Sequence, residues 1–324
     1  MGALPVISPD VVLGGALALL SLLTYGICMV LVSVCVRTFR SEPGSLIAAA
    51  ACIPAGILIS CWQLAFGEVQ VGISAWAVVA FALAGIFSTY LGRWLVFKSI
   101  ELNGPSGASA LQSTSPLLTA VFAWVFLGEV IGWVGMLGIT MAIVGLVSMS
   151  FGLQRRAATH KTAAAALASA SSGRSMVWAS LVVGVGSSVA YSGSHIFRGS
   201  AVRIWNEPLL GATIGAGAAL VALLLASRSK WPEYKQEILA NRKGAWQFAG
   251  IGVLQFLAQT LVIASMKYIP VSVAALVSMC TPLVVVPISY FILRNEERLN
   301  GVMFIGILIT LCGTLTSLVF AGRA

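Results

Sequence analysis

Residues 104–129 read GPSGASALQSTSPLLTAVFAWVFLGE, a segment with small polar residues at its start, Pro116 near its middle and Glu129 at its end. Its length suits a helix that crosses about 30 Å of hydrocarbon, which takes roughly 20 residues. Residues 270–297 read PVSVAALVSMCTPLVVVPISYFILRNEE and keep the same order of small residues, proline and glutamate. The similarity indicates that one helical unit occurs twice in the chain.

The rest of the chain is duplicated around these two segments. A shift of 166 residues superposes like residues of the two halves, and after two additional residues in the second half the shift becomes 168. A collinear set of matches with one small insertion indicates an internal duplication. The matched pairs are Tyr25 with Tyr191, Arg37 with Arg203, Ala108 with Ala274, Pro116 with Pro282, Leu117 with Leu283, Glu129 with Glu297, Gly138 with Gly306 and Gly145 with Gly313.

The composition indicates a membrane protein. Hydrophobic residues make up 59% of the 324 residues, charged residues make up 9%, and the mean hydropathy is +0.98. A soluble domain is about a quarter charged, so most of this protein's surface must face lipid. This excludes a soluble enzyme, a nucleic-acid-binding protein and a disordered scaffold. The net charge of +9 comes from basic residues in short gaps between apolar runs, which is typical of membrane topology.

Ten apolar segments are long enough to cross a bilayer as helices. Each half of the chain contains five, so the two halves must lie in opposite orientations, as in many secondary transporters. The predicted fold is an all-α integral membrane protein with ten transmembrane helices in two inverted five-helix repeats. We expect a first repeat at 11–152, a polar connecting loop at 153–175 and a second repeat at 176–321. The predicted helices are 11–36, 44–67, 74–99, 105–127, 131–152, 176–198, 207–227, 245–267, 270–293 and 299–321.

The two quoted segments resemble the EamA domain. In each copy a glycine-rich helix follows, GMLGITMAIVGLV in the first and GILITLCGTL in the second. Two such units make the whole chain similar to ten-helix members of the drug/metabolite transporter superfamily. This resemblance implies a transporter whose central cavity is lined chiefly by helices 1, 3, 4, 6, 8 and 9. The second copy departs from the pattern, because Arg294, Asn295 and Glu296 replace Leu-Gly before Glu297.

The basic residues are divided unevenly between the two faces of the membrane. If the ten helices alternate in direction, the face with both termini holds four basic residues and the other face holds the remaining fifteen of the chain's 19. The positive-inside rule then places both termini outside, whereas the resemblance implies cytoplasmic termini. We follow the charge count and expect a multi-pass protein of the cell membrane. The four basic residues are Arg198, Arg203, Lys267 and Arg323.

The acidic residues all fall at predicted helix ends or in loops. Proton-coupled export of lipophilic cations usually needs a buried carboxylate that exchanges a proton for substrate. The pattern therefore argues against a cationic-drug antiporter. Glu129 and Glu297 are the nearest candidates for a carboxylate proton relay, but we expect them to tie off their helix ends or to pair with Arg or Lys.

Arg93 is the basic residue with the clearest functional interpretation. It lies about five residues before the end of the third predicted helix, between Tyr90 and Trp94. One interpretation is a cation that holds the anionic group of a substrate in the central cavity. The alternative is an arginine that extends to the interface, with its neighbours as an aromatic belt. Its partner in the second repeat is Gln259, which is neutral but still forms hydrogen bonds.

Other polar and aromatic residues are candidates for the wall of a substrate cavity. Serine and threonine in membrane helices also bond to their own backbone, so that interpretation stays open for those residues. His195 is either a titrating group near the substrate or a neutral structural residue. Pro116 and Pro282 should kink the fourth and ninth helices. The remaining candidates are Tyr25, Gln112, Ser115, Tyr191, Gln255, Ser278 and Thr281.

Two segments have open structural interpretations. Gly211 and Gly215 form a G-x-x-x-G pattern that indicates close helix packing, within a monomer or at a dimer contact. Residues 228–244 form either a short interfacial helix or a solvated loop.

An intramembrane serine protease is a remote alternative. Gly104-Pro105-Ser106-Gly107 matches a G-x-S-G pattern, and His195 would have to act as the base. The repeat copy of this tetrapeptide, beginning at Ile269, keeps no such pattern. The duplication already accounts for the segment, so we expect no enzymatic activity.

The predicted function is secondary transport by alternating access. The sequence shows no ATP-binding loop, no metal-ligand spacing and no cofactor motif. Arg93 favours a small polar metabolite with a carboxylate, such as an amino acid or another organic acid. A broad exporter of amphipathic aromatic compounds, with Tyr25, Tyr90, Trp94 and Tyr191 as stacking surfaces, is the alternative. The expected partners are the substrate, the lipid bilayer and either a coupling ion or a counter-substrate, with the protein a monomer or a homodimer.

Overall fold

The computed structural model describes residues 9–36, 38–66, 74–96, 98–99, 102, 111–160, 174–292 and 301–320. Every regular element in this part of the chain is a helix. The first half contains α1 (Pro9–Cys35), α2 (Ser41–Phe66), α3 (Ala75–Gly85), the π-helix η1 (Ile86–Gly92), α5 (Ser115–Leu127) and α6 (Trp133–His160). The second half contains α8 (Arg174–Ile204), α9 (Pro208–Ser227), η2 (Arg228–Lys230), α10 (Trp231–Ala240), α11 (Arg242–Ser265), α12 (Val271–Met279), α13 (Pro282–Ile292) and α14 (Gly301–Phe320).

Five helical segments of the described residues have the length and apolar character of membrane spans. Shorter apolar helical segments cover Ser115–Leu127, Trp133–Ser148, Val271–Val285 and Phe304–Phe320. The chain is therefore a multi-pass, all-helical membrane protein, and the exact number of ten spans stays a prediction. Within the part of the chain that the structure describes, the segments long enough to cross a bilayer are Pro9–Cys35, Ser41–Gln63, Ala75–Val96, Pro208–Ala240 and Arg242–Ser265.

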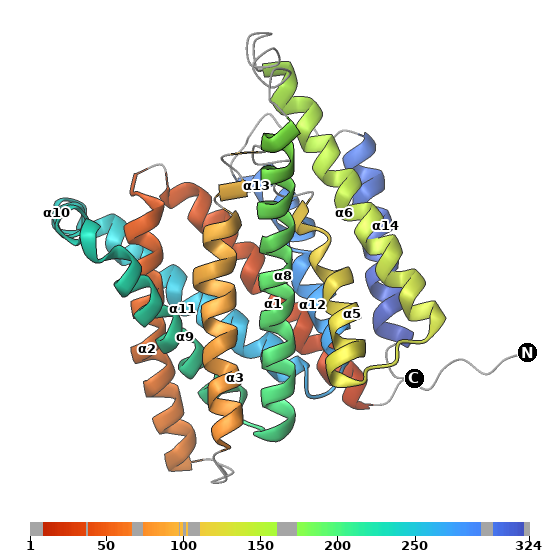
Figure 1. Cartoon of the computed structure of the whole chain (residues 1–324), viewed down its shortest axis with the longest axis horizontal. Coiled ribbons are helices and arrows are strands. Elements are labelled where there is room, and N and C mark those ends of the chain that lie inside the picture. Colours follow the sequence, from red (N-terminus) through yellow and green to blue (C-terminus); the bar gives the residue numbers. More distant parts are fainter. Residues whose placement is uncertain are drawn as a thin grey trace, which may run out of the picture.

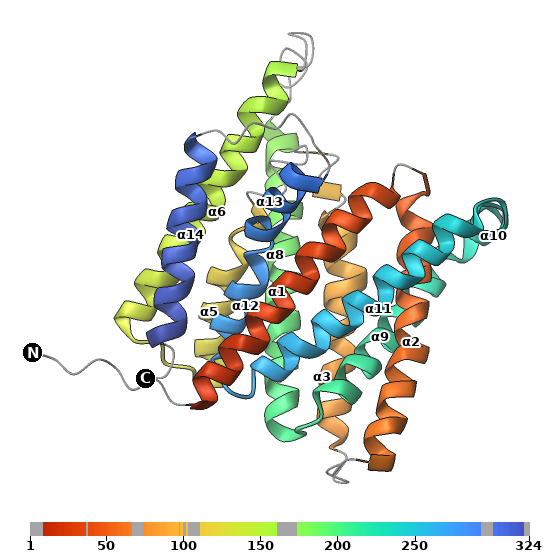
Figure 2. The ribbon, with the colours of Figure 1, turned by 180° about the vertical axis from the view of Figure 1, so that it is seen from behind.

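The helices of the two halves are arranged as repeat copies. In Figure 1, α1 and α8 run in opposite directions, and α14 begins at the end of the bundle where α6 finishes. Figure 2 shows the same relation from behind. The packing follows the repeat, because α1 packs against α11 while its copy α8 packs against α3, the copy of α11. The copies α6 and α14 pack against each other.

Several predicted helices differ from those in the structure. The fifth was expected to end at 152, but α6 continues to His160, into the predicted loop 153–175. The fourth was expected over 105–127, but a turn at 113–114 precedes α5, which begins at Ser115. The sixth was expected to end at 198, but α8 continues to Ile204. The ninth was expected to be continuous over 270–293, but it breaks between α12 and α13, where Pro282 begins the second piece. The third contains the π-helix η1. A proline has no backbone N–H and clashes with the preceding turn, which explains the break before Pro282.

Glycines set the closest approach between α3 and α9. A Cβ atom added at Gly85 would lie 1.9 Å from the carbonyl oxygen of Gly215, and one added at Gly211 would lie 2.4 Å from the ring of Phe81. Small residues at a helix crossing let the two backbones come this close. In the structure, the G-x-x-x-G pattern of α9 therefore serves a contact within one chain.

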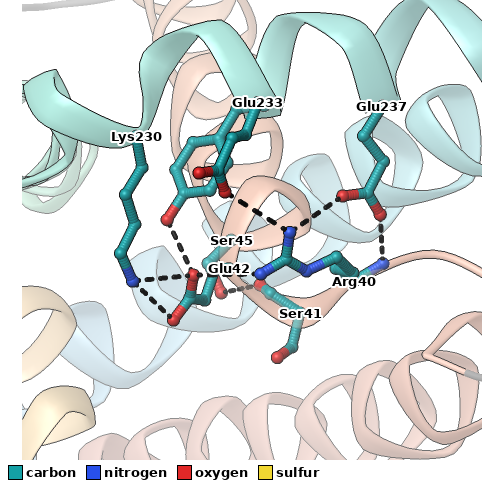
Figure 3. Close-up of polar contacts among 8 residues, drawn as sticks. Arg40, Ser41, Glu42, Ser45, Lys230, Glu233 and Glu237 are labelled. Atoms are coloured by element: carbon teal, nitrogen blue, oxygen red, sulfur yellow. Dashed lines mark hydrogen bonds and ion pairs between the residues drawn. The ribbon is translucent and has the colours of Figure 1, made fainter.

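A polar cluster holds α10 against the connection between α1 and α2, and Figure 3 shows it in close-up. The Arg40 guanidinium lies 3.8 Å from Glu42, 3.9 Å from Glu233 and 3.8 Å from Glu237. The Tyr234 hydroxyl donates a hydrogen bond of 2.8 Å to Glu42. Exposed ion pairs of this kind each stabilise a fold by about 0.2–1 kcal/mol. Residues 231–240 are thus a helix rather than a loop.

Candidate functional site

The third helix changes its geometry just before Arg93. Over Ile86–Gly92 it becomes the π-helix η1, and helical structure then continues through Val96. A π-helix holds more residues in each turn than an α-helix, so it turns the side chains to new directions, and such segments are frequent at functional sites. Here the segment contains Ser88 and Thr89 and is followed directly by Arg93.

A narrow cavity lies between helices of both repeats. Its volume is about 20 Å³, which is room for about one water molecule. Among the sequence-predicted site residues, Arg93, Gln255 and Gln259 line it. The full lining consists of Ser45, Ala49, Cys52, Thr89, Arg93, Ala216, Ala219, Gln255, Phe256 and Gln259.

Four of the polar residues that line the cavity form two repeat pairs. Arg93 and Gln259 are separated by the repeat shift of 166 residues, and so are Thr89 and Gln255. Both pairs line the cavity, which therefore lies at the interface of the two repeats, where inverted-repeat transporters bind substrate. The sequence analysis missed Thr89. The signal that would have found it was its position opposite Gln255 in the repeat.

Arg198 is a second cation inside the bundle. It is only 5% exposed, and its Nη2 donates to the Ser88 hydroxyl oxygen at 2.9 Å and to Gln259 Oε1 at 3.3 Å. The sequence analysis placed Arg198 at the end of the sixth helix, on the outer face, which is wrong because α8 continues to Ile204 and buries it. The helical spacing of four and then three residues from Tyr191 through His195 to Arg198 was the available signal. Without Arg198, the face with both termini still holds fewer basic residues than the other face, so the orientation predicted from charge is unchanged.

Two tyrosines flank the cavity residues from matching positions of the repeats. The side chain of Tyr25 lies close enough to Gln259 and Arg198 to interact with both. Tyr191 lies within electrostatic range of both Arg93 and Arg198. A Cβ atom added at Gly92 would lie 3.0 Å from the Tyr191 ring. Tyr25 thus lies near Gln259 of the second repeat, and Tyr191 lies near the segment of the first repeat that carries Arg93.

The cavity has a positive electrostatic character. Within the described ranges, neither Arg93 nor Arg198 forms an ion pair with a carboxylate. The groups that hold Arg198 are neutral oxygens. A buried cation without a counter-ion is unfavourable unless hydrogen bonds or a bound anion compensate for the lost hydration. The site is therefore suited to a ligand that brings negative charge.

The other predicted site residues lie outside the cavity lining. Trp94 is 57% exposed on the outer surface, and Tyr90 and Gln112 are half-buried. Ser115 bonds to Ser192 of α8 at 3.2 Å and so joins two helices. Two more hydroxyls, those of Ser278 and Thr281, bond to backbone oxygens of their own segment.

His195 is buried and partly unpaired. It is 4% exposed, and its Nδ1 has no hydrogen-bond partner among the described residues. Pro116 occupies the first turn of α5 and Pro282 that of α13. Ser106 and Glu297 lie outside the described residues.

Glu129 closes the end of the bundle near the start of α1. Its carboxylate pairs with Arg203 and accepts hydrogen bonds from the backbone N–H of Val271 at 2.8 Å and of Ser272 at 3.4 Å. The Ser272 hydroxyl donates to it at 3.1 Å. A carboxylate at a helix N-terminus satisfies free N–H groups and interacts favourably with the helix dipole. The expectation that Glu129 pairs with a basic residue at a helix end is confirmed.

Comparisons with known proteins agree with this architecture. The model of the EamA-like transporter family matches residues 12–151 and 165–319. Twenty-nine solved chains match the structure. One of them, described as "Crystal structure of protein", has 15% sequence identity and a TM-score of 0.64, covering 96% of this chain and 99% of its own. At that identity the likeness shows the fold alone. No curated protein sequence matches the chain.

Proposed function

Since the chain belongs to the EamA-like transporter family, we propose that it is a secondary transporter of a small organic anion and works by alternating access. The family consists of multi-pass membrane transporters of the drug/metabolite type. The favoured substrates are amino acids or other organic acids. The observation that carries this proposal is Arg93, which lines a cavity between the two repeats together with neutral polar side chains.

An anionic substrate accounts for the energetic cost of Arg93. An arginine costs about 2.5–3.5 kcal/mol on insertion scales if it lies at the centre of the membrane, and less if it extends to the interface. Side chains that compensate for this cost are usually carboxylates, and none pairs with Arg93 in the described structure. A substrate carboxylate would supply the missing charge. Gln255 and Gln259, which share the cavity, offer amide groups to orient the rest of a polar substrate.

Alternating access is supported by the small size of the cavity and by the repeat symmetry. A cavity of about 20 Å³ admits a metabolite only after the surrounding helices separate. Inverted repeats can exchange conformations, so that opening toward one side of the membrane mirrors opening toward the other. The repeat-related contacts of α1 with α11 and of α8 with α3 are the pairs that would exchange.

The exporter of aromatic compounds has less support. It relied on four stacking surfaces, Tyr25, Tyr90, Trp94 and Tyr191, none of which lines the cavity. Trp94 is 57% exposed on the outside of the bundle. It remains the outcome to expect if aromatic compounds compete with one another regardless of charge.

We expect Arg93→Gln to abolish the stabilisation of the purified protein by carboxylate ligands. A ligand at a hundred times its dissociation constant adds about 2.7 kcal/mol to the free energy of unfolding. In Arg93→Gln the anion loses its cation and this increment should vanish, whereas Arg93→Lys should keep part of it. Thermal unfolding in detergent, followed by uptake into proteoliposomes, measures both effects.

The matched control is Arg228→Gln, because Arg228 lies outside the cavity lining and its loss changes the net charge equally. The control should respond to carboxylates like the wild type. If Arg93→Gln binds and transports every anion as the wild type does, the anion site is wrong and Arg93 is an interfacial anchor.

A further inference from the structure

Arg93 of the first repeat and Arg198 of the second both lie near Gln259 and Tyr191. Gln259 lines the cavity together with Arg93, and its Oε1 accepts a hydrogen bond of 3.3 Å from Arg198. Tyr191 lies within electrostatic range of both guanidinium groups. Gln259 therefore stands between the cavity and the second cation. A group that displaced the Gln259 amide would meet Arg198 directly.

The hydrogen bonds of Arg198 do not neutralise its charge. Ser88 and Gln259 offer neutral oxygens, and Arg198 is only 5% exposed. A carboxylate or a phosphate would add the attraction of opposite charges to these bonds, and an arginine fork can bind either group through two parallel hydrogen bonds. The Gln259 oxygen thus occupies a position that an anionic oxygen would fill more favourably.

From this arrangement we infer that the cavity binds a dianion. One anionic group pairs with Arg93, and the second replaces Gln259 Oε1 as the acceptor of Arg198. This inference rests on the proposed function and names the substrate class more closely, as a molecule with two negative charges. Dicarboxylates and phosphate monoesters share that chemistry.

A dianion would also connect the two repeats. Arg93 follows η1 in the first repeat, and Arg198 belongs to α8 in the second. Arg198 already bonds to Ser88 of η1, so the two cations are joined through the π-helix as well as through Gln259. A ligand held by both guanidinium groups bridges the elements that must move relative to each other in alternating access. A monoanion held by Arg93 alone would leave this second contact unused.

The test compares dicarboxylates and phosphate monoesters with the monoamides of the same dicarboxylates. A monoamide keeps the size and one charge of the parent compound but loses the second charge. In wild-type protein we expect at least one dianion to bind about tenfold or more tightly than its monoamide or neutral-capped counterpart. Calorimetry and thermal unfolding of the full chain in detergent measure the ratio.

The decisive variant is Gln259→Glu, which puts a fixed carboxylate at the position from which Oε1 now contacts Arg198. This carboxylate replaces the second charge of the ligand, so the preference for the dianion over the monoamide should fall to near unity. The variant keeps the size of the side chain and gives a buried cation a partner, so we expect it to fold. The matched control is Gln236→Glu, an exposed position on α10, which should keep the wild-type ratio.

The outcomes separate this inference from the proposed function. If monoamides bind the wild type as tightly as the dianions do, the dianion site is overturned while a single-anion transporter survives. If Gln259→Glu keeps the full preference, Arg198 is a structural residue and the inference is likewise overturned. If no anion stabilises the wild type, both proposals fail. Binding of dicarboxylates alone or of phosphate esters alone supports the inference and identifies the source of the charge.

Discussion

Replacement of Glu129 by alanine is expected to lower the free energy of unfolding by about 2–4 kcal/mol. The side chain of Glu129 is 8% exposed and that of its ion-pair partner Arg203 is 39% exposed. The substitution removes the acceptor of the Val271 and Ser272 N–H groups and leaves the guanidinium unpaired. Thermal and chemical unfolding in detergent measure the loss.

A double-mutant cycle separates the contribution of the Glu129–Arg203 ion pair from that of the hydrogen bonds between Glu129 and the start of α12. Arg203→Ala alone should cost less than Glu129→Ala, because Arg203 is more exposed and the cap on α12 is kept. The two effects should not add, since the residues share one ion pair. The control is Glu233→Ala, at a side chain that is 67% exposed and should change stability by less than about 1 kcal/mol. A loss at Glu129 no larger than at Glu233 would contradict the role assigned to the cap.

Introducing a single methyl group at Gly85 is expected to destabilise the fold by about 3 kcal/mol. The Cβ of Gly85→Ala would lie 1.9 Å from the Gly215 carbonyl oxygen. The atom in the way belongs to the backbone, so α3 and α9 must move apart rather than rearrange a side chain. Thermal unfolding of the purified variant measures the shift.

Gly217→Ala is the matched control, on α9 two residues beyond the close contact. A Cβ atom added there meets nothing within 4 Å, and alanine is a better helix former than glycine by about 1 kcal/mol. The control should therefore be neutral or slightly stabilising. If both substitutions behave alike, the close crossing of α3 and α9 is not present in the protein in detergent.

The sequence predicts those parts of the molecule whose structure depends on interactions between residues close together in the chain. A run of about 20 apolar residues satisfies its own backbone as a helix in lipid, and α1, α2 and α11 were predicted to within three residues at each end. The duplication was visible because repeat copies keep their residues in register. Of the candidate cavity residues, Arg93 and Gln259 were found as a repeat pair. The substrate, the orientation and the number of spans stay predictions.

Arg198 shows where local reasoning stopped. An arginine after an apolar run is typical of a helix end, yet here the helix continues and the guanidinium is buried. Its hydrogen-bond partners lie 110 and 61 residues away in the chain, on η1 and α11. Likewise, Glu129 was recognisable as a residue that closes a helix end, but Val271, whose N–H donates to it, lies 142 residues later.

The length of the apolar segments and the register of the two repeat copies can be read from the sequence alone. These two features determined the class of fold and the resemblance to the family. The tertiary structure determined which polar groups meet inside the bundle. The physical reason is that a buried charge is tolerated only where distant elements supply its partners. No local pattern specifies those partners, and only the packed helices bring Arg198, Gln259 and Ser88 together.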